Sequence, residues 1–301
     1  MKINSNFLND NRLNIISLLL TPFQKNGEID EIAYIDYLKW QITFKPQALF
    51  CVCGSSEMKW LNYKERLKLI KTTVTYSKKI PVIATSNLEQ NIDLNIDEVR
   101  AISDLGVSAI VLVPPNNIKI NSTKHYEYLK IIKNNSSVPL ILYEWPFIEN
   151  HLINANFYKK LIDNNVIIGI KDTSCTIEGI MSKYYVSKKS LIFQANTPYL
   201  LESLNKGITG IMTVTSTIGM PLLNSFAKSF LKMSEDLATI HRELVFLDSL
   251  LRINYPSSAK YIANLIGIKF NLYTRWPNNL SLEQKKSIDV WFNNREFINF
   301  L

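Results

Sequence analysis

Two residues with side chains suited to covalent and acid–base chemistry each stand at the end of a short apolar run. Lys171 follows the run at 166–170, and Tyr143 follows the run at 138–142. An apolar run of this length predicts a strand buried on both faces, where an unpaired ammonium is strongly disfavoured. Two interpretations of Lys171 remain open: the strand ends there and the ammonium reaches water, or burial lowers the lysine pKa. In the second case the amine is partly neutral near pH 7 and can attack a carbonyl carbon.

A third group of candidate residues is a loop of small residues, Gly54, Ser55 and Ser56, directly after the apolar run at 48–53. Backbone N–H groups of such a loop can hold a carboxylate. The phenol of Tyr143 can shuttle protons while a carbinolamine forms and a C–C bond breaks. A lysine, a phenol and this loop are what imine chemistry on a 2-oxo acid requires. Because the iminium is itself the electron sink, we expect no metal and no cofactor.

Eight apolar runs, separated by segments with helical spacing, must bring these groups together. The runs are residues 14–20, 48–53, 80–84, 108–113, 138–143, 166–171, 191–195 and 208–214. The helical segments are residues 32–44, 63–76, 92–105, 123–134, 156–163, 177–187 and 199–205. This alternation predicts an α/β fold with a parallel sheet, and eight units of this length favour a closed (β/α)8 TIM barrel. Catalytic groups of such barrels lie at the carboxyl ends of the strands, so the candidate residues should meet at one mouth.

Four further helical segments follow the eighth run. They are residues 222–230, 240–252, 259–266 and 282–297. A barrel needs only one more helix to close, so the remainder predicts a C-terminal helical extension. We therefore expect a barrel over residues 1–221, and residues 222–301 that complete the barrel and form the extension.

Composition excludes several classes of protein. The chain has 301 residues, 47% of them hydrophobic, which is a globular composition. The net charge is +8, but the basic residues are spread along the chain, which disfavours nucleic-acid binding. Three cysteines, Cys51, Cys53 and Cys175, give neither a disulfide framework nor a paired ligand set for zinc. No apolar run approaches the ~20 residues of a membrane span and no secretory signal is present, so we expect no membrane association and a cytoplasmic location.

Five motifs resemble those of a known family. They are LLTPF…GEID within residues 19–30, CGSSEMKWL at 53–61, VPLILYEWP at 138–146, IIGIKDT at 167–173 and GITGIMTV at 207–214. Their order and spacing resemble the dihydrodipicolinate synthase / N-acetylneuraminate lyase family of class I, Schiff-base-forming aldolases, over roughly residues 13 to 225.

The resemblance implies a role for each candidate residue. Lys171 would form the Schiff base with pyruvate or another 2-oxo acid, and Tyr143 would transfer protons. The loop that begins at Gly54 would bind the carboxylate, with Ile211 at the back of the pocket. A serine of this loop would supply a relay hydroxyl, but alternative alignments leave Ser55 and Ser56 equally eligible.

The sequence also departs from the family pattern. The synthase has an arginine five residues after the tyrosine, where this chain has Ile148. An aromatic pair that family members lend across a subunit contact is replaced by Asn116 and Asn117. Thr173 resembles a substrate hydroxyl contact of the sugar-acid lyases, and Glu144 either binds substrate hydroxyls or faces solvent.

Three functions are therefore weighed. The first is a carbon–carbon lyase or aldolase, with a carbon–oxygen hydro-lyase as a variant, that handles a 2-oxo acid and an aldehyde of sugar-acid type. The second is 4-hydroxy-tetrahydrodipicolinate (dihydrodipicolinate) synthase. The third is a catalytically silent family member that binds a metabolite. Because the family commonly forms tetramers built from dimers, we also expect a homo-oligomer, a dimer or a tetramer.

Overall fold

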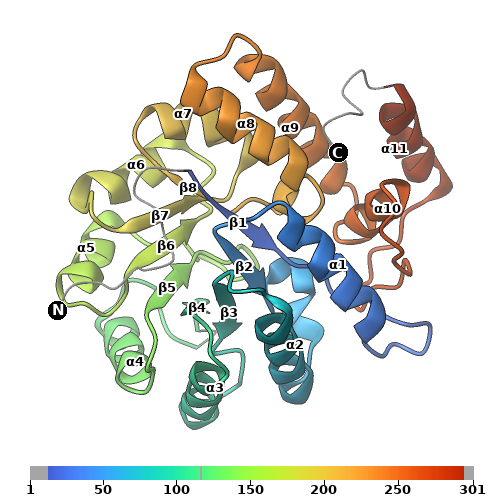
Figure 1. Cartoon of the computed structure of the whole chain (residues 1–301). Helices are drawn as coiled ribbons and strands as arrows, with labels where there is room; N and C mark the ends of the chain where they lie inside the picture. The colour runs from blue at the N-terminus through green and yellow to red at the C-terminus, as the bar shows by residue number, and fades with distance from the viewer. Residues whose placement is uncertain (1–12, 116, 295–301) are drawn as a thin grey trace.

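Eight parallel strands close into a barrel in the computed structural model, which describes residues 13–115 and 117–294 (Figure 1). Each strand pairs with the next along the chain, and β8 pairs with β1. The strands are β1 (Asn14–Leu18), β2 (Ala48–Cys51), β3 (Val82–Ser86), β4 (Ala109–Leu112), β5 (Leu140–Tyr143), β6 (Gly169–Asp172), β7 (Leu191–Gln194) and β8 (Gly210–Ile211). The predicted (β/α)8 TIM barrel is confirmed.

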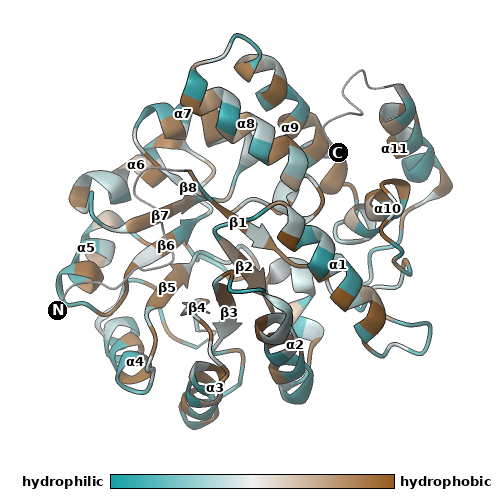
Figure 2. Ribbon diagram, in the orientation of Figure 1, coloured by the Kyte–Doolittle hydropathy of each residue, from teal (hydrophilic) through white to brown (hydrophobic). Residues whose placement is uncertain are grey.

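Helices follow the strands and surround the barrel. They are α1 (Glu31–Thr43), α2 (Tyr63–Tyr76), α3 (Ile92–Asp104), α4 (Thr123–Asn134), α5 (Ala155–Asp163), α6 (Ile177–Val186), α7 (Leu200–Asn205) and α8 (Met220–Lys232). Figure 2 shows hydrophobic strands at the centre and hydrophilic outer faces on helices such as α3 and α4. Local capping sets several helix starts: Asp30, for example, accepts a hydrogen bond from the N–H of Ala33 at 3.1 Å.

Three further helices form the predicted extension: α9 (Leu237–Leu251), α10 (Ser257–Leu265) and α11 (Leu282–Asn294). Helix α9 packs on α8, while α10 and α11 pack together at one side of the barrel (Figure 1). Helix α8 begins at Met220, two residues before the predicted start, and the predicted end of the last helix at 297 lies outside the described residues. No helix in the described part of the chain combines the length and apolar character needed to cross a membrane.

All eight strands differ from their predicted bounds by at least one residue, and two of these differences have a local reason. Strand β3 covers Val82–Ser86 rather than residues 80–84, because the chain enters the ladder only after Pro81, which has no N–H to donate. Strand β8 is limited to Gly210–Ile211, since the chain soon turns into the 3-10 segment η4 (Val214–Thr217).

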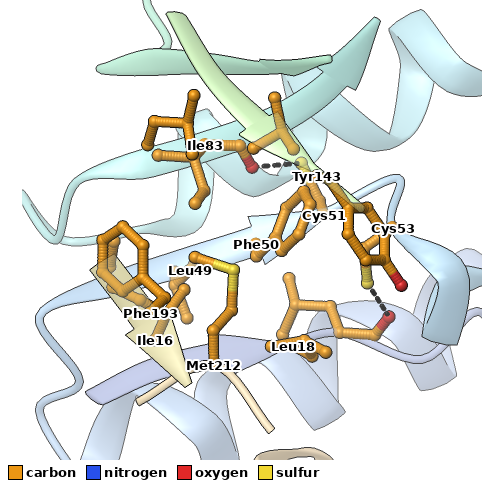
Figure 3. Packing of buried hydrophobic residues seen from close by; sticks show 14 of the residues in the cluster. Ile16, Leu18, Leu49, Phe50, Cys51, Cys53, Ile83, Tyr143, Phe193 and Met212 are labelled. Atoms are coloured by element: carbon orange, nitrogen blue, oxygen red, sulfur yellow. Dashed lines mark hydrogen bonds between the residues drawn. The ribbon is translucent and has the colours of Figure 1, made fainter. Parts of the chain in front are cut away.

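Side-chain alternation along the strands sorts residues between the barrel interior and the helix layer. Lys171 pairs in register with Tyr143 on one side and with Phe193 on the other, so these three side chains share a face. Figure 3 shows Phe193 among the side chains that fill the barrel interior. Gly210 pairs with Phe193, and a Cβ at this glycine would lie 2.6 Å from the phenyl ring. Glycine here therefore leaves room for the aromatic ring.

Candidate active site

Lys171 lies inside the barrel on β6, and its side chain is only 3% exposed. Its Nζ is 4.2 Å from the centre of the Tyr143 ring and 5.7 Å from that of Phe50. Burial lowers the pKa of Lys171 to about 8, while the neighbouring Cys53 acts in the opposite direction. The structure therefore favours the second interpretation of this lysine, a buried amine that is partly neutral at physiological pH.

A pH profile follows from this lowered pKa. The neutral amine is the nucleophile, so the rate of imine formation with pyruvate should rise with pH and level off above about 8. At pH 7 about a tenth of the side chains would be neutral, compared with roughly one in a few thousand for an ordinary lysine. Trapping with cyanoborohydride across this range measures the profile. A midpoint near 10 would contradict the effect of burial.

Tyr143 lies on β5 directly beside Lys171 in the sheet register. Burial raises the pKa of its phenol, so the hydroxyl is protonated at neutral pH and can donate. The Gly54 loop lies against this hydroxyl, because a Cβ built on Gly54 would be 3.5 Å from the Tyr143 oxygen. A proton-transfer phenol, an amine and the small-residue loop thus occur at the same end of the barrel.

The two serines of the loop have different surroundings. Ser56 Oγ donates to the carbonyl of Leu19 at 2.6 Å and accepts from the N–H of Cys53 at 3.1 Å. Ser55 Oγ is buried without a hydrogen-bond partner in the described part of the chain. Its neighbour is the phenol of Tyr255, which is also buried without a hydrogen-bond partner there and whose pKa is raised by burial. Ser56 therefore fixes the loop, while the hydroxyl of Ser55 remains available.

The loop itself is a 3-10 turn, η1 (Gly54–Ser56), anchored from behind by the C-terminal segment. The first N–H groups of such a turn have no partner inside it. Glu57, which follows the turn, accepts from Lys260 Nζ at 2.7 Å and from the N–H groups of Arg275 and Trp276 at 2.7 and 2.8 Å. No local pattern indicates these anchors, since Lys260 lies 203 residues from Glu57.

Glu144 lies neither in the site nor in contact with solvent, the two alternatives that the sequence left open, while Thr173, two residues after Lys171, stays a predicted substrate contact. Glu144 follows the inward-facing Tyr143, so strand alternation directs it to the helix layer. There it is fully buried, accepts from the N–H groups of Ile153 and Thr173 at 2.8 and 2.9 Å, and pairs with Lys183 at 2.8 Å. The hydroxyl of Thr173 donates to the Glu144 carbonyl.

The polar groups behind the site form a buried cluster around Lys183 on α6. Its ammonium pairs with Glu144 and with Asp172, which directly follow Tyr143 and Lys171 in the chain. Burial and the nearby Asp172 raise the pKa of Glu144, while Lys183 opposes this shift. The cluster joins the ends of β5 and β6 and so helps to position the two candidate catalytic residues.

Ile211 also differs from its expected position at the back of the pocket. It pairs in register with Gln194, whose side chain donates to Ser203 of α7 in the helix layer at 2.9 Å. Ile211 therefore shares this outward face. The next residue, Met212, faces inward, and Figure 3 shows it beside Leu18 and Phe193. A shift of one residue along a strand moves a side chain to the other face, which explains the correction.

A pocket of about 550 Å³ opens beside these groups at the barrel mouth. Loops that follow β2, β3, β4 and β5 line it, with Met58, Asn87, Pro114, Asn117, Trp145, Phe147 and Ile148 among the lining residues. Asn116 lies outside the described residues. Arg66 is also in the lining, but its guanidinium is paired with Glu89 and with Glu98, at 2.6 Å from the latter. The pocket thus offers aromatic and amide groups together with two cations, the paired Arg66 and the exposed Lys59.

Metal-binding side chains do not gather at this mouth. In residues 13–115 and 117–294, no group of three or more His, Cys, Asp or Glu side chains is arranged to hold a metal ion.

Comparisons with known proteins complete the description of the site. A model of the dihydrodipicolinate synthetase family matches residues 11–291. The 4-hydroxy-tetrahydrodipicolinate synthase of Brucella abortus is 26% identical over 264 residues, covering 84% of this chain and 87% of the relative. The crystal structure of dihydrodipicolinate synthase DapA-2 from Bacillus anthracis aligns with a TM-score of 0.88 at 21% identity, over 96% of this chain and 99% of that one. YagE of E. coli K12, solved in complex with pyruvate, aligns with a TM-score of 0.87 at 18% identity, over 96% and 99%.

Proposed function

Because the chain belongs to the dihydrodipicolinate synthetase family, we propose that it forms an imine between Lys171 and a 2-oxo acid. Members of this family are class I aldolases and lyases that use a covalent lysine–pyruvate imine and no metal or other cofactor. The resemblance inferred from the five sequence motifs is thereby confirmed. The observation that carries the proposal is the buried Lys171, with a pKa lowered to about 8, next to the Tyr143 ring.

The chain's own residues account for each step. The neutral amine of Lys171 attacks the carbonyl carbon of pyruvate, and loss of water gives the imine. Tyr143 protonates the departing hydroxyl, and the phenolate so formed takes a proton from the methyl carbon to give an enamine, whose carbon attacks an aldehyde. Tyr143 supplies the proton that the aldehyde oxygen gains, and water then hydrolyses the imine to release the product. The lyase direction runs through the same steps in reverse.

The small-residue loop is proposed to bind the 2-oxo acid carboxylate. The N–H groups of Gly54 and Ser55 begin the 3-10 turn and are the available donors. Ser55, rather than Ser56, is proposed as the relay hydroxyl, because Ser56 is already bonded to Leu19 and Cys53. Met212 takes the place of Ile211 in this proposal, since it is the β8-end residue that faces inward.

The aldehyde is proposed to be uncharged and hydroxylated, so that the condensation product is a sugar-acid-type compound. Ile148 lines the pocket at the position where the synthase has its arginine. The lining guanidinium of Arg66 is neutralised by two carboxylates, Glu89 and Glu98. The other lining cation is Lys59, an exposed side chain, so the buried part of the pocket offers a second substrate carboxylate no unpaired cation. Amides in the lining, such as that of Asn117, suit hydroxyl groups.

Two alternatives keep specific support. The curated relative from Brucella abortus carries the name 4-hydroxy-tetrahydrodipicolinate synthase, which favours aspartate semialdehyde as the aldehyde. A silent member that only binds a metabolite is the other alternative. The expected homo-oligomer stays a prediction: tetramers are typical of the family, although a monomeric dihydrodipicolinate synthase variant is among the structural relatives.

The experiment separates these functions in two stages. The protein is incubated with pyruvate, reduced with borohydride, and the modified peptide is located by mass spectrometry. An adduct at Lys171 is expected. A panel of 2-keto-3-deoxy sugar acids, N-acetylneuraminate and aspartate semialdehyde follows, and we expect pyruvate release from a sugar acid. Consumption of aspartate semialdehyde alone would favour the synthase, and no adduct with any 2-oxo acid would leave the silent binder.

A further inference from the structure

Trp145 presents a buried hydrogen-bond donor that the fold leaves unused. Its side chain is 7% exposed, and the indole nitrogen has no hydrogen-bond partner in the described part of the chain. Buried donors are nearly always paired in folded proteins, so an unpaired one inside a functional pocket indicates a group that a ligand completes. Neither the five motifs nor the imine chemistry assigns a role to this residue.

The position of the indole ties it to the reacting centre. The backbone N–H of Trp145 donates to the Tyr143 carbonyl at 2.9 Å, in a tight turn directly after β5. A Cβ built on Gly54 would lie 3.5 Å from the Tyr143 hydroxyl and 3.8 Å from the indole nitrogen. Both polar groups therefore border the same small space, which stays open because residue 54 has no side chain.

The same side chain reaches the pocket that would receive the aldehyde. Trp145 and Phe147 both line the pocket of about 550 Å³, and their rings are 5.4 Å apart. Phe147 in turn packs edge-on against Trp276, at 4.8 Å, so the indole belongs to an aromatic wall. Trp145 thus connects the aldehyde pocket with the hydroxyl that exchanges the proton.

We propose that the indole N–H of Trp145 donates a hydrogen bond to the aldehyde oxygen, the same oxygen that gains its proton from Tyr143. This inference rests on the proposed function and adds a substrate-binding residue to it. As the enamine carbon attacks, the carbonyl oxygen takes up the electron pair of the breaking π bond. The phenol supplies its proton, whereas the neutral indole keeps its own and stabilises the developing charge. In the cleavage direction, the indole holds the hydroxyl while its proton passes to Tyr143.

The test replaces only the donor. Trp145→Phe keeps an aromatic ring for packing against Phe147 and removes the N–H group. We expect the pyruvate adduct to form at an unchanged rate and with an unchanged pH profile, because the aldehyde oxygen is absent from that step. We expect kcat to fall about 10- to 100-fold with whichever aldehyde of the panel the wild type converts, with a smaller change in KM, since the bond strengthens as charge develops. Trp40→Phe, on α1 beside Phe44, is the matched control and should match the wild type.

Other results would contradict either the role of the indole or the proposed function. A kcat for Trp145→Phe within twofold of the wild type would overturn the role of the indole. Equal losses in adduct formation and in turnover would also overturn it, since they would indicate a structural role. If the wild type forms no pyruvate adduct, or forms one and converts no aldehyde, the proposed function itself fails and this inference fails with it.

Discussion

Lys171→Ala is expected to abolish the pyruvate adduct and to lower kcat by at least about 10⁴-fold, the scale of loss when a covalent nucleophile is removed. The reason is chemical, because the imine cannot form without a primary amine inside the barrel. Borohydride trapping followed by mass spectrometry measures adduct formation, and pyruvate release from a sugar acid measures turnover. Removal of one buried ammonium without a carboxylate partner should leave the fold intact.

Two further variants make this result specific. Lys171→Arg keeps a positively charged side chain of similar length but offers no neutral amine, since a guanidinium is not deprotonated in proteins. It should therefore fail as completely as the alanine variant. Lys188→Ala removes an exposed lysine beyond α6 and should behave as the wild type. An adduct that persists in Lys171→Ala would place the chemistry on another lysine and refute the assignment.

Lys260→Met is expected to lower the free energy of unfolding by about 3–5 kcal/mol, the usual effect of removing one partner of a buried ion pair. Both Lys260 and Glu57 are 0% exposed, and the ammonium is 2.7 Å from the carboxylate and 2.7 Å from the carbonyl of Tyr273. Methionine would leave the buried carboxylate without its cation. Urea unfolding measures the change as a lower midpoint at an unchanged slope.

An exposed ion pair supplies the matched control for this prediction. Lys68 and Glu31 are 53% and 51% exposed, and exposed pairs contribute at most about 1 kcal/mol. Lys68→Met should therefore change stability little. The double variant Lys260→Met with Glu57→Gln should be more stable than Lys260→Met alone, because no unpaired charge remains. Equal destabilisation by Lys260→Met and Lys68→Met would show that burial of the pair has no energetic consequence.

Lys260→Met should also weaken the binding of pyruvate in the candidate active site. Glu57 directly follows the turn that offers Gly54 and Ser55 to the substrate carboxylate, and it is held by the C-terminal segment. Loosening this anchor should raise the pyruvate concentration needed for half-maximal adduct formation. The pH midpoint should stay near 8, since Lys171 remains buried in the barrel.

Much of the fold was predictable from local patterns. Apolar runs and helical spacing each depend on a few neighbouring residues, and α2 and α4 have the predicted bounds. The strand ends were harder to predict, because a strand ends where its ladder partners end. On β8 this had a consequence for the site, since a difference of one residue separates the outward Ile211 from the inward Met212.

The candidate site was predictable in its chemistry but not in its contacts. Lys171 and Tyr143 are conspicuous in the sequence because each ends an apolar strand. Glu144 follows Tyr143 just as conspicuously, yet it is bound to Lys183 on α6, a contact that arises only when the helix packs on the sheet. Trp145 could not be distinguished from an ordinary core tryptophan until its indole nitrogen was seen without a partner.

The sequence by itself determined the barrel, the amine and the phenol, because periodicity and residue type are properties of short segments. The tertiary structure decided which serine hydroxyl is free, which carboxylates are already paired and how far the Lys171 pKa falls. Each of these depends on burial and on partners from distant segments, as Glu57 and Lys260 illustrate across 203 residues. Desolvation and pairing are set by the packed whole, and no local pattern encodes them.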